Sequence, residues 1–420
     1  MTHFKKSSYL IPTLILGLCF IECCTFVKMG SLFLSGDIHQ KGFTRSVDFE
    51  YIGNLVFIKV KINNVPQDYR FLFDNGASFN VISTRIAQNI GFESVVEDTI
   101  KDAAKKTDKV KFCKIPRLTI AGIPFIDTAA AIMDLNQNTW LECYGIDGVV
   151  GMNLIRLVNK WQIDYQSKKI TFSDQSVLVD PSAKKRVITF DQNIQRIPEI
   201  DLYLHDQLKV KCTIDLGSTS AFSLDIKTWE KLEKIKPDIR YISRTGELGG
   251  GALGTQTGTI FLAVFDNLKA GETPLGSYWI RFEPSVFNSV GNRFWQNYVI
   301  TFNWEEKTLT LTDSVATKED VEFPSYGFGY GYDTGTRNLY INFLYEPSPA
   351  EKSGLKIQDK IMSINGLNLE GIQPDDYCRF LLQPETLLGK GNRIEMVIER
   401  SGQIQTFDLE KEDLFAELRK

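Results

Sequence analysis

Histidine is scarce in this chain, which has three in 420 residues. They are His3, His39 and His205, and none belongs to a His-Glu-x-x-His sequence. A zinc hydrolase of that kind is therefore excluded, and a serine–histidine triad would have to be built on His39 or His205. Because His205 stands at the predicted tip of a hairpin, we expect it to be solvent-exposed rather than catalytic.

Cysteine is also sparse beyond the N-terminal segment. After residue 24 the chain contains only Cys113, Cys143, Cys212 and Cys378. Their spacing fits no metal site, and four scattered cysteines make no disulfide framework. We expect buried free thiols or a single bridge, and neither a metal ion nor a cofactor.

A long apolar run is missing as well. An uncharged stretch from Ser7 to Ile21, with Pro12 inside it, follows two lysines. Its length of about 15 residues is short of the roughly 20 that a membrane-spanning helix needs. We therefore predict that residues 1–28 are a cleaved export signal, which implies a periplasmic or cell-envelope location. The alternatives are a retained membrane anchor in this segment and lipid attachment at Cys19, Cys23 or Cys24.

The chain carries no excess of positive charge. Its net charge is -4 and its pI is near 5.7, which argues against nucleic acid as a partner and does not favour anionic membranes. A length of 420 residues leaves room for two or three domains. The 28 Phe, 15 Tyr and many short alternating runs favour a mainly β fold.

Two stretches share one pattern, in which an apolar strand ends in an aspartate that is followed by one residue and a glycine. The aspartates are Asp74 and Asp215. A buried acid is costly to hold unless a nearby group shares or neutralises its charge, so we expect the two to face each other. The copies read Phe71-Leu72-Phe73-Asp74-Asn75-Gly76-Ala77-Ser78 and Thr213-Ile214-Asp215-Leu216-Gly217-Ser218.

A second pair of markers follows the aspartates at matching distances. Val149-Val150-Gly151 comes after the first aspartate, and Val290-Gly291 comes after the second. The separation is 77 positions from Asp74 to Gly151 and 76 from Asp215 to Gly291. Markers in the same order at nearly equal spacing predict an internal duplication, with one lobe at 49–180 and the other at 185–315.

Each copy also has an insert between its aspartate and its later glycine. The first runs from residue 96 to 112 and is rich in lysine, including Lys105 and Lys106; the second runs from 246 to 260 and contains Gly249-Gly250-Gly251. Lysine-rich stretches are usually solvated faces, and glycine clusters are usually flexible loops. Their matching positions favour two mobile flaps over the aspartates.

These motifs resemble the aspartic peptidase superfamily, specifically the retropepsin-like lobes found in bacterial proteins. The resemblance covers residues 49–312. It implies two closed β lobes, a peptide or protein substrate, and Asp74 and Asp215 as the catalytic carboxylates. The active-site turns that it implies consist of Asn75, Gly76 and Ser78 in one lobe and of Leu216, Gly217 and Ser218 in the other.

Two such carboxyl groups can together catalyse the hydrolysis of a peptide bond. Held about 3 Å apart, they cannot both ionise and therefore share a proton. The ionised group can act as a general base on water, while the protonated group supplies a proton to the carbonyl or the leaving amine. This reaction needs neither a metal ion nor a histidine.

The chain departs from the family directly after each aspartate. The family has Thr or Ser there, whose hydroxyl joins the lobes, whereas this chain has Asn75 and Leu216. Because a leucine side chain neither donates nor accepts, we expect a half-satisfied network and a loosened pair of acids. Ser218, by contrast, is expected to bond Asp215. The alternatives are thus a peptide-binding protein of the same fold with lapsed catalysis, and an enzyme that cuts only its own N-terminal segment.

Residues 323–415 are predicted to form a third domain. The run Ser348-Pro349-Ala350, Gly354-Leu355, Asp359, Ile361 and Ile364-Asn365-Gly366 resembles a PDZ domain of the type fused to bacterial proteases. The resemblance implies a small β-barrel with helices that binds a peptide C-terminus as an added strand. The carboxylate loop is predicted at Gly327-Phe328-Gly329-Tyr330, and residues 375–382 are predicted to form the helix beside the groove. We expect the whole protein to be a monomer.

Overall fold

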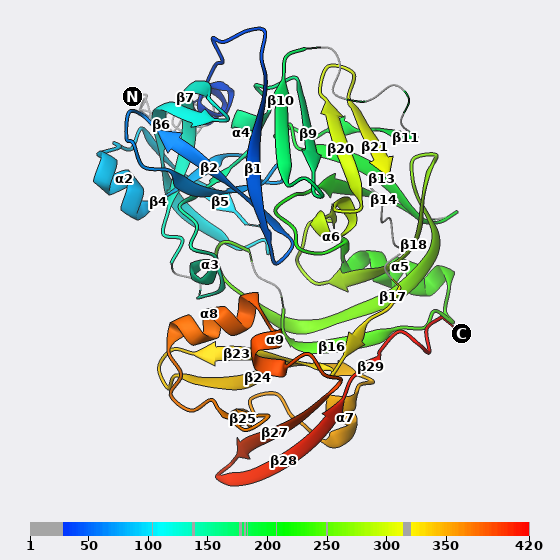
Figure 1. Ribbon diagram of the computed structural model, residues 1–420. Coiled ribbons are helices and arrows are strands. Elements are labelled where there is room, and N and C mark those ends of the chain that lie inside the picture. Colours follow the sequence, from blue (N-terminus) through cyan, green and yellow to red (C-terminus); the bar gives the residue numbers. More distant parts are fainter. Residues whose placement is uncertain are drawn as a thin grey trace, which may run out of the picture.

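The computed structural model describes residues 28–419, except for residues 103, 137–138, 176–178, 180–181, 183, 207, 249–250 and 314–320. The predicted export signal, apart from Lys28, therefore lies outside the described residues, as do Gly249 and Gly250. The described chain is mainly β, and it folds into two lobes with the C-terminal residues beneath them in Figure 1. No helix within the described ranges is both long and apolar enough to cross a membrane.

Lobe 1 begins with β1, before the predicted start at residue 49. Its helix α2 begins after Ser83, whose Oγ accepts the N–H of Ile86, and ends at Gly91, which has a φ of 80°. The sequence itself predicts a short helix over 84–90 that ends at Gly91, and the structure confirms it. The elements are β1 (Thr44–Ile52), β2 (Leu55–Ile62), β3 (Tyr69–Phe73), β4 (Asn80–Ser83), α2 (Thr84–Ile90), β5 (Val96–Lys101), β6 (Thr107–Ile120), β7 (Ile123–Met133), α3 (Thr139–Tyr144), β8 (Gly148–Val150), α4 (Met152–Ile155), β9 (Lys160–Asp164) and β10 (Lys169–Ser173).

Lobe 2 shows the alternation expected of strands that bury one face. In its strand β13, Ile200, Leu202 and Leu204 are buried, while the residues between them are less so. The elements are β11 (Lys185–Thr189), β12 (Asp191–Gln192), β13 (Pro198–His205), β14 (Leu208–Ile214), β15 (Phe222–Asp225), α5 (Ile226–Ile235), β16 (Ile242–Glu247), β17 (Thr257–Ala270), β18 (Thr273–Glu283), β19 (Ser289–Val290), α6 (Asn292–Trp295), β20 (Tyr298–Asn303) and β21 (Thr308–Asp313). His205, at the end of β13, is exposed as predicted.

The strand pairings of one lobe recur in the other. In lobe 1, β3 pairs in parallel with β8, and β4 pairs in parallel with β7. In lobe 2, β14 pairs in parallel with β19, and β15 pairs in parallel with β18. These pairings are what an internal duplication would produce, although the duplication itself stays a prediction from the sequence.

The two lobes are joined by a sheet to which both contribute. Its strand order is β1-β10-β9-β20-β21-β11, and β9 of lobe 1 pairs antiparallel with β20 of lobe 2. At this junction the rings of Trp161 and Phe302 stack with their centroids 4.1 Å apart. Because buried residues of both lobes belong to one apolar cluster, the lobes share a core.

The C-terminal module (residues 323–415) has its own apolar cluster but is joined to both lobes. Its strand β24 pairs antiparallel with β16 of lobe 2 over Gly246↔Phe343 to Ser243↔Glu346, and a Cys143–Cys378 disulfide ties α8 to α3 of lobe 1 (Figure 1). The elements are β22 (Pro324–Ser325), β23 (Phe328–Asp333), β24 (Asn338–Glu346), α7 (Pro349–Ser353), β25 (Lys360–Ile364), β26 (Leu367–Asn368), α8 (Pro374–Leu382), α9 (Glu385–Leu388), β27 (Arg393–Arg400), β28 (Gln403–Glu410) and β29 (Glu412–Asp413).

Candidate active site

Asp74 and Asp215 stand at the ends of two strands that are supported in the same way. Beside parallel β8, the N–H of Asp74 donates to the carbonyl oxygen of Val150 at 3.0 Å. Beside parallel β19, the N–H of Asp215 donates to the carbonyl oxygen of Val290, also at 3.0 Å. Each aspartate therefore extends the parallel strand pairing by one backbone hydrogen bond beyond the last residue of its own strand.

The side chains of the two aspartates meet between the lobes, where each carboxyl group lies against the glycine turn of the other lobe and acts on the pKa of the other carboxyl group. The N–H of Gly76 donates to Oδ1 of Asp74 at 2.8 Å, and the N–H of Gly217 donates to Oδ1 of Asp215 at 2.8 Å. A Cβ on Gly76 would lie 2.5 Å from Oδ1 of Asp215, and a Cβ on Gly217 would collide with Asp74. Only glycine therefore allows each turn to approach the opposite carboxyl group this closely.

Burial raises the pKa of both carboxyl groups, because the charged forms lose their contact with water. For Asp215, burial and then the negative charge of Asp74 raise the pKa to about 8. For Asp74, the backbone N–H groups that donate to it oppose the effect of burial. Backbone N–H groups oppose burial at Asp215 as well, and because two carboxyl groups this close cannot both ionise, the pair holds one proton between them.

The Asn75 side chain makes two hydrogen bonds across the lobe interface, one as a donor and one as an acceptor. Its Nδ2 donates to the carbonyl oxygen of Ile214 at 2.9 Å, and its Oδ1 accepts the N–H of Leu216 at 2.8 Å. Asn75 and Leu216 are both fully buried. The expectation of a half-satisfied network at this position is therefore wrong, because an amide both donates and accepts and the Leu216 backbone replaces the missing hydroxyl.

The serines of the two turns do not bond the carboxyl groups through their hydroxyls. Oγ of Ser218 shares a hydrogen bond with Oγ of Ser220 at 2.9 Å. The predicted bond from the Ser218 hydroxyl to the Asp215 carboxyl group is wrong, because that hydroxyl is bonded to Ser220, while the N–H of Ser218 donates to the carbonyl oxygen of Asp215 at 3.3 Å. In lobe 1, Ser78 presents its carbonyl oxygen to the N–H of Asn153 at 3.0 Å. Backbone groups thus support the pair in both lobes.

The two predicted flaps contact each other through their tips, which we define as the lobe-1 tip (residues 102–106) and the lobe-2 tip (residues 251–256). Asp102, which is 7% exposed, accepts the N–H of Lys106 at 2.9 Å and the N–H of Leu253 at 2.9 Å. Nζ of Lys106 donates to the carbonyl oxygen of Thr255 at 2.6 Å. These bonds therefore join the tip of one lobe to the tip of the other. Gly251, at the start of the lobe-2 tip, packs so closely against Asp102 that a Cβ there would collide with the carboxylate.

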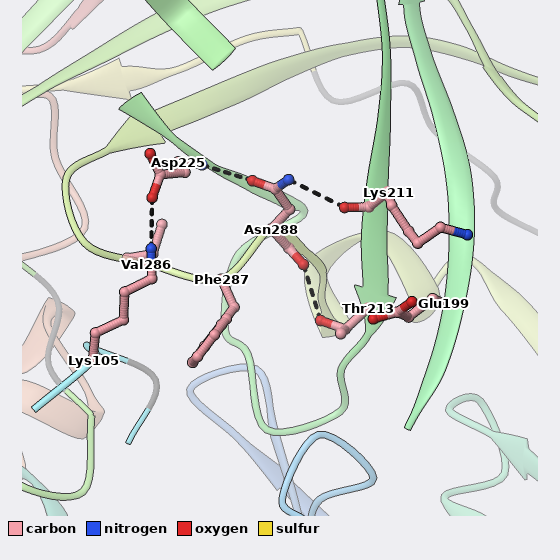
Figure 2. A pocket seen from close by; sticks show the side chains of 8 residues that line it. All are labelled: Lys105, Glu199, Lys211, Thr213, Asp225, Val286, Phe287 and Asn288. Atoms are coloured by element: carbon pink, nitrogen blue, oxygen red, sulfur yellow. Dashed lines mark hydrogen bonds and ion pairs between the residues drawn. The ribbon is translucent and has the colours of Figure 1, made fainter. Parts of the chain in front are cut away.

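Lys105 adds a contact between the lobe-1 tip and the body of lobe 2. Its Nζ lies 2.7 Å from Oδ2 of Asp225 and 5.5 Å from the ring centroid of Phe287. Figure 2 shows these side chains at a cavity of about 290 Å³. Burial acts to raise the pKa of Asp225, but the hydrogen bonds and charge of Lys105, together with the N–H of Lys227, outweigh it and hold that pKa below its usual value. Neither Asp74 nor Asp215 lines this cavity.

The predicted carboxylate loop of the C-terminal module is shorter than expected. Gly327 lies before β23, whereas Phe328, Gly329 and Tyr330 belong to β23, so their assignment to the loop is wrong. Alternating glycines and aromatic residues suit a strand because successive side chains point to opposite faces. Gly327 has a φ of 93°, and its N–H donates to Oγ of Ser325 at 3.0 Å.

Tyr330 connects β23 to the predicted groove helix. Its hydroxyl donates to the carbonyl oxygen of Phe380 in α8 at 2.8 Å. The helix α8 begins at Pro374 and ends at Leu382, which confirms the prediction for residues 375–382. Among the described residues, β23 pairs with no strand other than β24, so its second edge lies beside α8 without a strand partner.

One residue near the aspartates, Asn292, was not identified as a site residue from the sequence. Asn292 is fully buried and donates to the carbonyl oxygen of Leu216 at 2.6 Å. The available signal was a difference between the copies, since Asn292 follows Gly291 where Met152 follows Gly151.

In the part of the chain that the structure describes, no three His, Cys, Asp or Glu side chains are grouped as metal ligands.

Comparison with known proteins gives one match to a protein family. The family model described as aspartyl protease matches residues 58–154, a segment that contains Asp74 but not Asp215. A curated relative, Glutamate receptor-interacting protein 2 of Xenopus laevis, is 27% identical over 105 residues, which are 25% of this chain and 9% of that protein. The chain therefore spans less than a tenth of that relative's length.

Among solved structures, Basic 7S globulin from soybean is similar with a TM-score of 0.40 and 8% sequence identity. The similarity covers 64% of this chain and 95% of the globulin chain, and at this TM-score it carries no argument about fold or function. The family match and the mainly β lobes together support a peptidase as the class of protein.

Proposed function

We infer that this chain is an aspartic endopeptidase that hydrolyses peptide bonds with a water molecule activated between Asp74 and Asp215. The observation that carries this inference is the meeting of two buried carboxyl groups at the ends of matching strands, each against the glycine turn of the other lobe. The aspartyl protease match over residues 58–154 supports it. The Asn75 contact supports it further, because it supplies the interlobe link that the sequence had called into question.

The proposed roles of the acids follow from their surroundings. Ionised Asp74 takes a proton from the water as its oxygen attacks the carbonyl carbon, and protonated Asp215 donates to the carbonyl oxygen. A tetrahedral diol results. When the C–N bond breaks, the proton held by Asp74 passes to the leaving amine, and Asp215 regains its proton as the carbonyl re-forms.

Peptide cleavage tests this proposal. A mixed peptide library is incubated from pH 3 to 8 with the wild type, Asp74→Asn, Asp215→Asn and the control Asp266→Asn, whose aspartate is exposed on β17. Cleavage by the wild type and the control is expected, with a loss of at least about 10³-fold in both active-site variants. Cleavage that survives in Asp74→Asn and Asp215→Asn would exclude the dyad.

Two other outcomes distinguish the alternative functions. Peptide binding without cleavage by any of the four proteins would favour a binding protein with lapsed catalysis. A loss of mass at the N-terminus of the wild type that is absent from both active-site variants, without cleavage of added peptides, would favour an enzyme that processes only itself.

We further propose that the C-terminal module is a PDZ domain that binds peptide ends along β23. Two features support it: the second edge of β23 has no strand partner among the described residues, and α8 lies beside it, bonded through Tyr330. Gln358 supports the resemblance too, since it has a φ of 73° where PDZ domains usually have glycine. A bound carboxylate would have to compete with Ser325 for the N–H of Gly327.

Peptide chemistry tests the module separately from the aspartates. Fluorescent peptides with free and with amidated C-termini are titrated into Asp215→Asn, which keeps them intact. Preference for the free carboxylate supports a PDZ-type site, whereas equal binding of both forms would contradict it.

Export to the periplasm or cell envelope is part of the same proposal. The Cys143–Cys378 disulfide supports it, because such bonds persist in oxidising compartments. Intact-mass measurement of the protein isolated from cell fractions tests both the location and the cleavage of residues 1–28.

A further inference from the structure

Leu216 is held on both sides of its backbone by asparagine side chains. Its N–H donates to Oδ1 of Asn75 from lobe 1, as described above. Its carbonyl oxygen accepts Nδ2 of Asn292 at 2.6 Å. Because Leu216 directly follows Asp215, these two bonds fix the peptide groups next to the second carboxyl group.

Asn292 belongs to lobe 2 in sequence, but two of the three hydrogen bonds of its side chain go to lobe 1. Its Nδ2 also donates to the carbonyl oxygen of Asn54 at 2.9 Å, and its Oδ1 accepts the hydroxyl of Tyr165 at 2.5 Å. Nδ2 of Asn54 in turn donates to the carbonyl oxygen of Thr219 at 3.1 Å. The Asp215 turn is therefore connected to lobe 1 through a network that does not pass through Asn75.

Around Asn292 the network is buried and its polar atoms are bonded, which makes this part of it rigid. Asn292 is fully buried, and Tyr165 is 9% exposed. The ring of Tyr165 packs edge-on against Phe49 and Tyr51, with centroid separations of 5.8 and 5.2 Å, so its hydroxyl is held toward Asn292. Every polar atom of the Asn292 side chain has a partner, and such satisfied buried networks specify a single geometry.

The other lobe shows what the network adds. At the matching position, directly after Gly151, lobe 1 has Met152, a fully buried member of the apolar core. Both residues make the same backbone contact: the N–H of Met152 donates to the carbonyl oxygen of Ala77 at 2.7 Å, and that of Asn292 donates to Ser218 at 2.9 Å. Only the Asn292 side chain adds bonds across the lobe interface.

We propose that Asn292 is a positioning residue that, together with Asn54 and Tyr165, holds Asp215 level with Asp74, as a second link between the lobes beside the one that Asn75 makes. Asn292 touches neither the reacting atoms nor substrate in this proposal; it acts through the backbone of Leu216. The inference rests on the proposed peptidase function only for its kinetic test, because the position of Asp215 can also be followed by its titration.

The kinetic test uses the residue that the other lobe carries. In Asn292→Met, kcat is expected to fall about 10- to 100-fold while KM changes less than about threefold, since small displacements of a reacting group act on the transition state. The pH profile of kcat/KM is expected to shift with it. Tyr165→Phe, which removes one bond to Asn292, is expected to act in the same direction with a smaller fall.

Two controls separate positioning from general destabilisation. Tyr332→Phe removes a buried bond that stays within the C-terminal module, to the carbonyl oxygen of Ile372, so it is expected to lower the melting temperature without moving the pH profile. In the Asn292→Met background, Tyr165→Phe is expected to have no further effect, because the two residues act as one unit. Additive losses, or a wild-type pH profile in folded Asn292→Met, would overturn the proposal.

Carbon-13 NMR titration of the aspartate carboxyl groups, assigned with Asp215→Asn, completes the test. Asn292→Met is expected to shift the titration of Asp215 away from its wild-type midpoint, whereas Tyr332→Phe leaves it in place. If the wild type cleaves no peptide but this shift occurs, the peptidase function fails and the positioning role stands. An unchanged Asp215 titration in Asn292→Met would overturn the positioning role even in an active enzyme.

Discussion

Asn75 and Leu216, the residues that directly follow the two aspartates, are hydrogen-bonded to each other across the lobe interface, from the N–H of Leu216 to Oδ1 of Asn75 at 2.8 Å. The second bond of Asn75, to the carbonyl oxygen of Ile214, spans the same interface. A single amide side chain thus contacts the backbone on both sides of Asp215. The pair of acids is therefore held from lobe 1 without a hydroxyl in lobe 2.

Replacing Asn75 should affect both stability and turnover. Asn75→Ala leaves the N–H of Leu216 and the carbonyl oxygen of Ile214 buried without partners, at a cost of about 1–3 kcal/mol for each group. The free energy of unfolding, measured in urea, is expected to fall by that amount, and kcat is expected to fall on the order of 10²-fold. Asn75→Thr, which keeps a donor and an acceptor, should recover part of both losses; equal losses in the two variants would contradict this account.

The raised pKa of Asp215 makes the stability of the protein depend on pH. Its carboxyl group has a pKa of about 8 in the folded protein against an ordinary value of 3.8. Because the folded state holds the extra proton between these values, the free energy of unfolding should be greatest at low pH and should decrease as pH rises towards 8.

Asp215→Asn should remove much of this dependence and stabilise the protein at pH 8, since it deletes a group that resists ionisation in its buried site. Urea unfolding at pH 5 and pH 8 measures the difference. Asp266→Asn, which changes an exposed aspartate, should retain the wild-type slope. A wild-type slope in Asp215→Asn would show that other groups dominate.

Loss of the Lys105–Asp225 contact should loosen the tips without unfolding the lobes. Both side chains are half-buried, at 32% and 17% exposure, so Lys105→Met is expected to lower the free energy of unfolding by about 1 kcal/mol or less. Hydrogen exchange of the lobe-1 and lobe-2 tips should nevertheless become faster. Lys109→Met, on the exposed part of β6, serves as the matched control and should leave exchange at the tips unchanged.

The disulfide should stabilise the attachment of the C-terminal module to lobe 1. The variant with both Cys143→Ser and Cys378→Ser is expected to lose about 2–4 kcal/mol of unfolding free energy, and its helices α3 and α8 should exchange faster. Strands β16 and β24 should keep their protection because their pairing does not depend on the bridge. A reductant should weaken the wild type and have no effect on the double variant.

Local signals in the sequence predicted the local features well. Gly91 ends α2 as predicted, because a left-handed turn at the end of a helix depends on residues within a few positions of each other. The repeated Asp-x-Gly pattern predicted the meeting of Asp74 with Asp215, since equal halves place equal residues at a common interface.

Contacts between distant segments could not be predicted in this way. The two bonds of Asn75 join residues 139 and 141 positions apart, and nothing in the sequence says which backbone groups lie within reach of that amide. The contacts between the tips and the pairing of β16 with β24 were missed for the same reason. Side chains and strand edges find such partners only after the lobes and the module have packed. The Phe328–Tyr330 segment was misassigned for a different reason, as glycine occurs in both loops and strands.

The shared edge of β16 and β24 also bears on where the molecule can be divided. Residues Ile242, Ile260 and Trp279 of lobe 2 are buried in one cluster with Leu414 and Phe415. A chain cut before residue 323 would expose that apolar face together with the unpaired backbone of β16, a combination that leads β proteins to aggregate. The peptidase portion is therefore expected to need its tail in order to stay monodisperse, even where the tail has no ligand to bind.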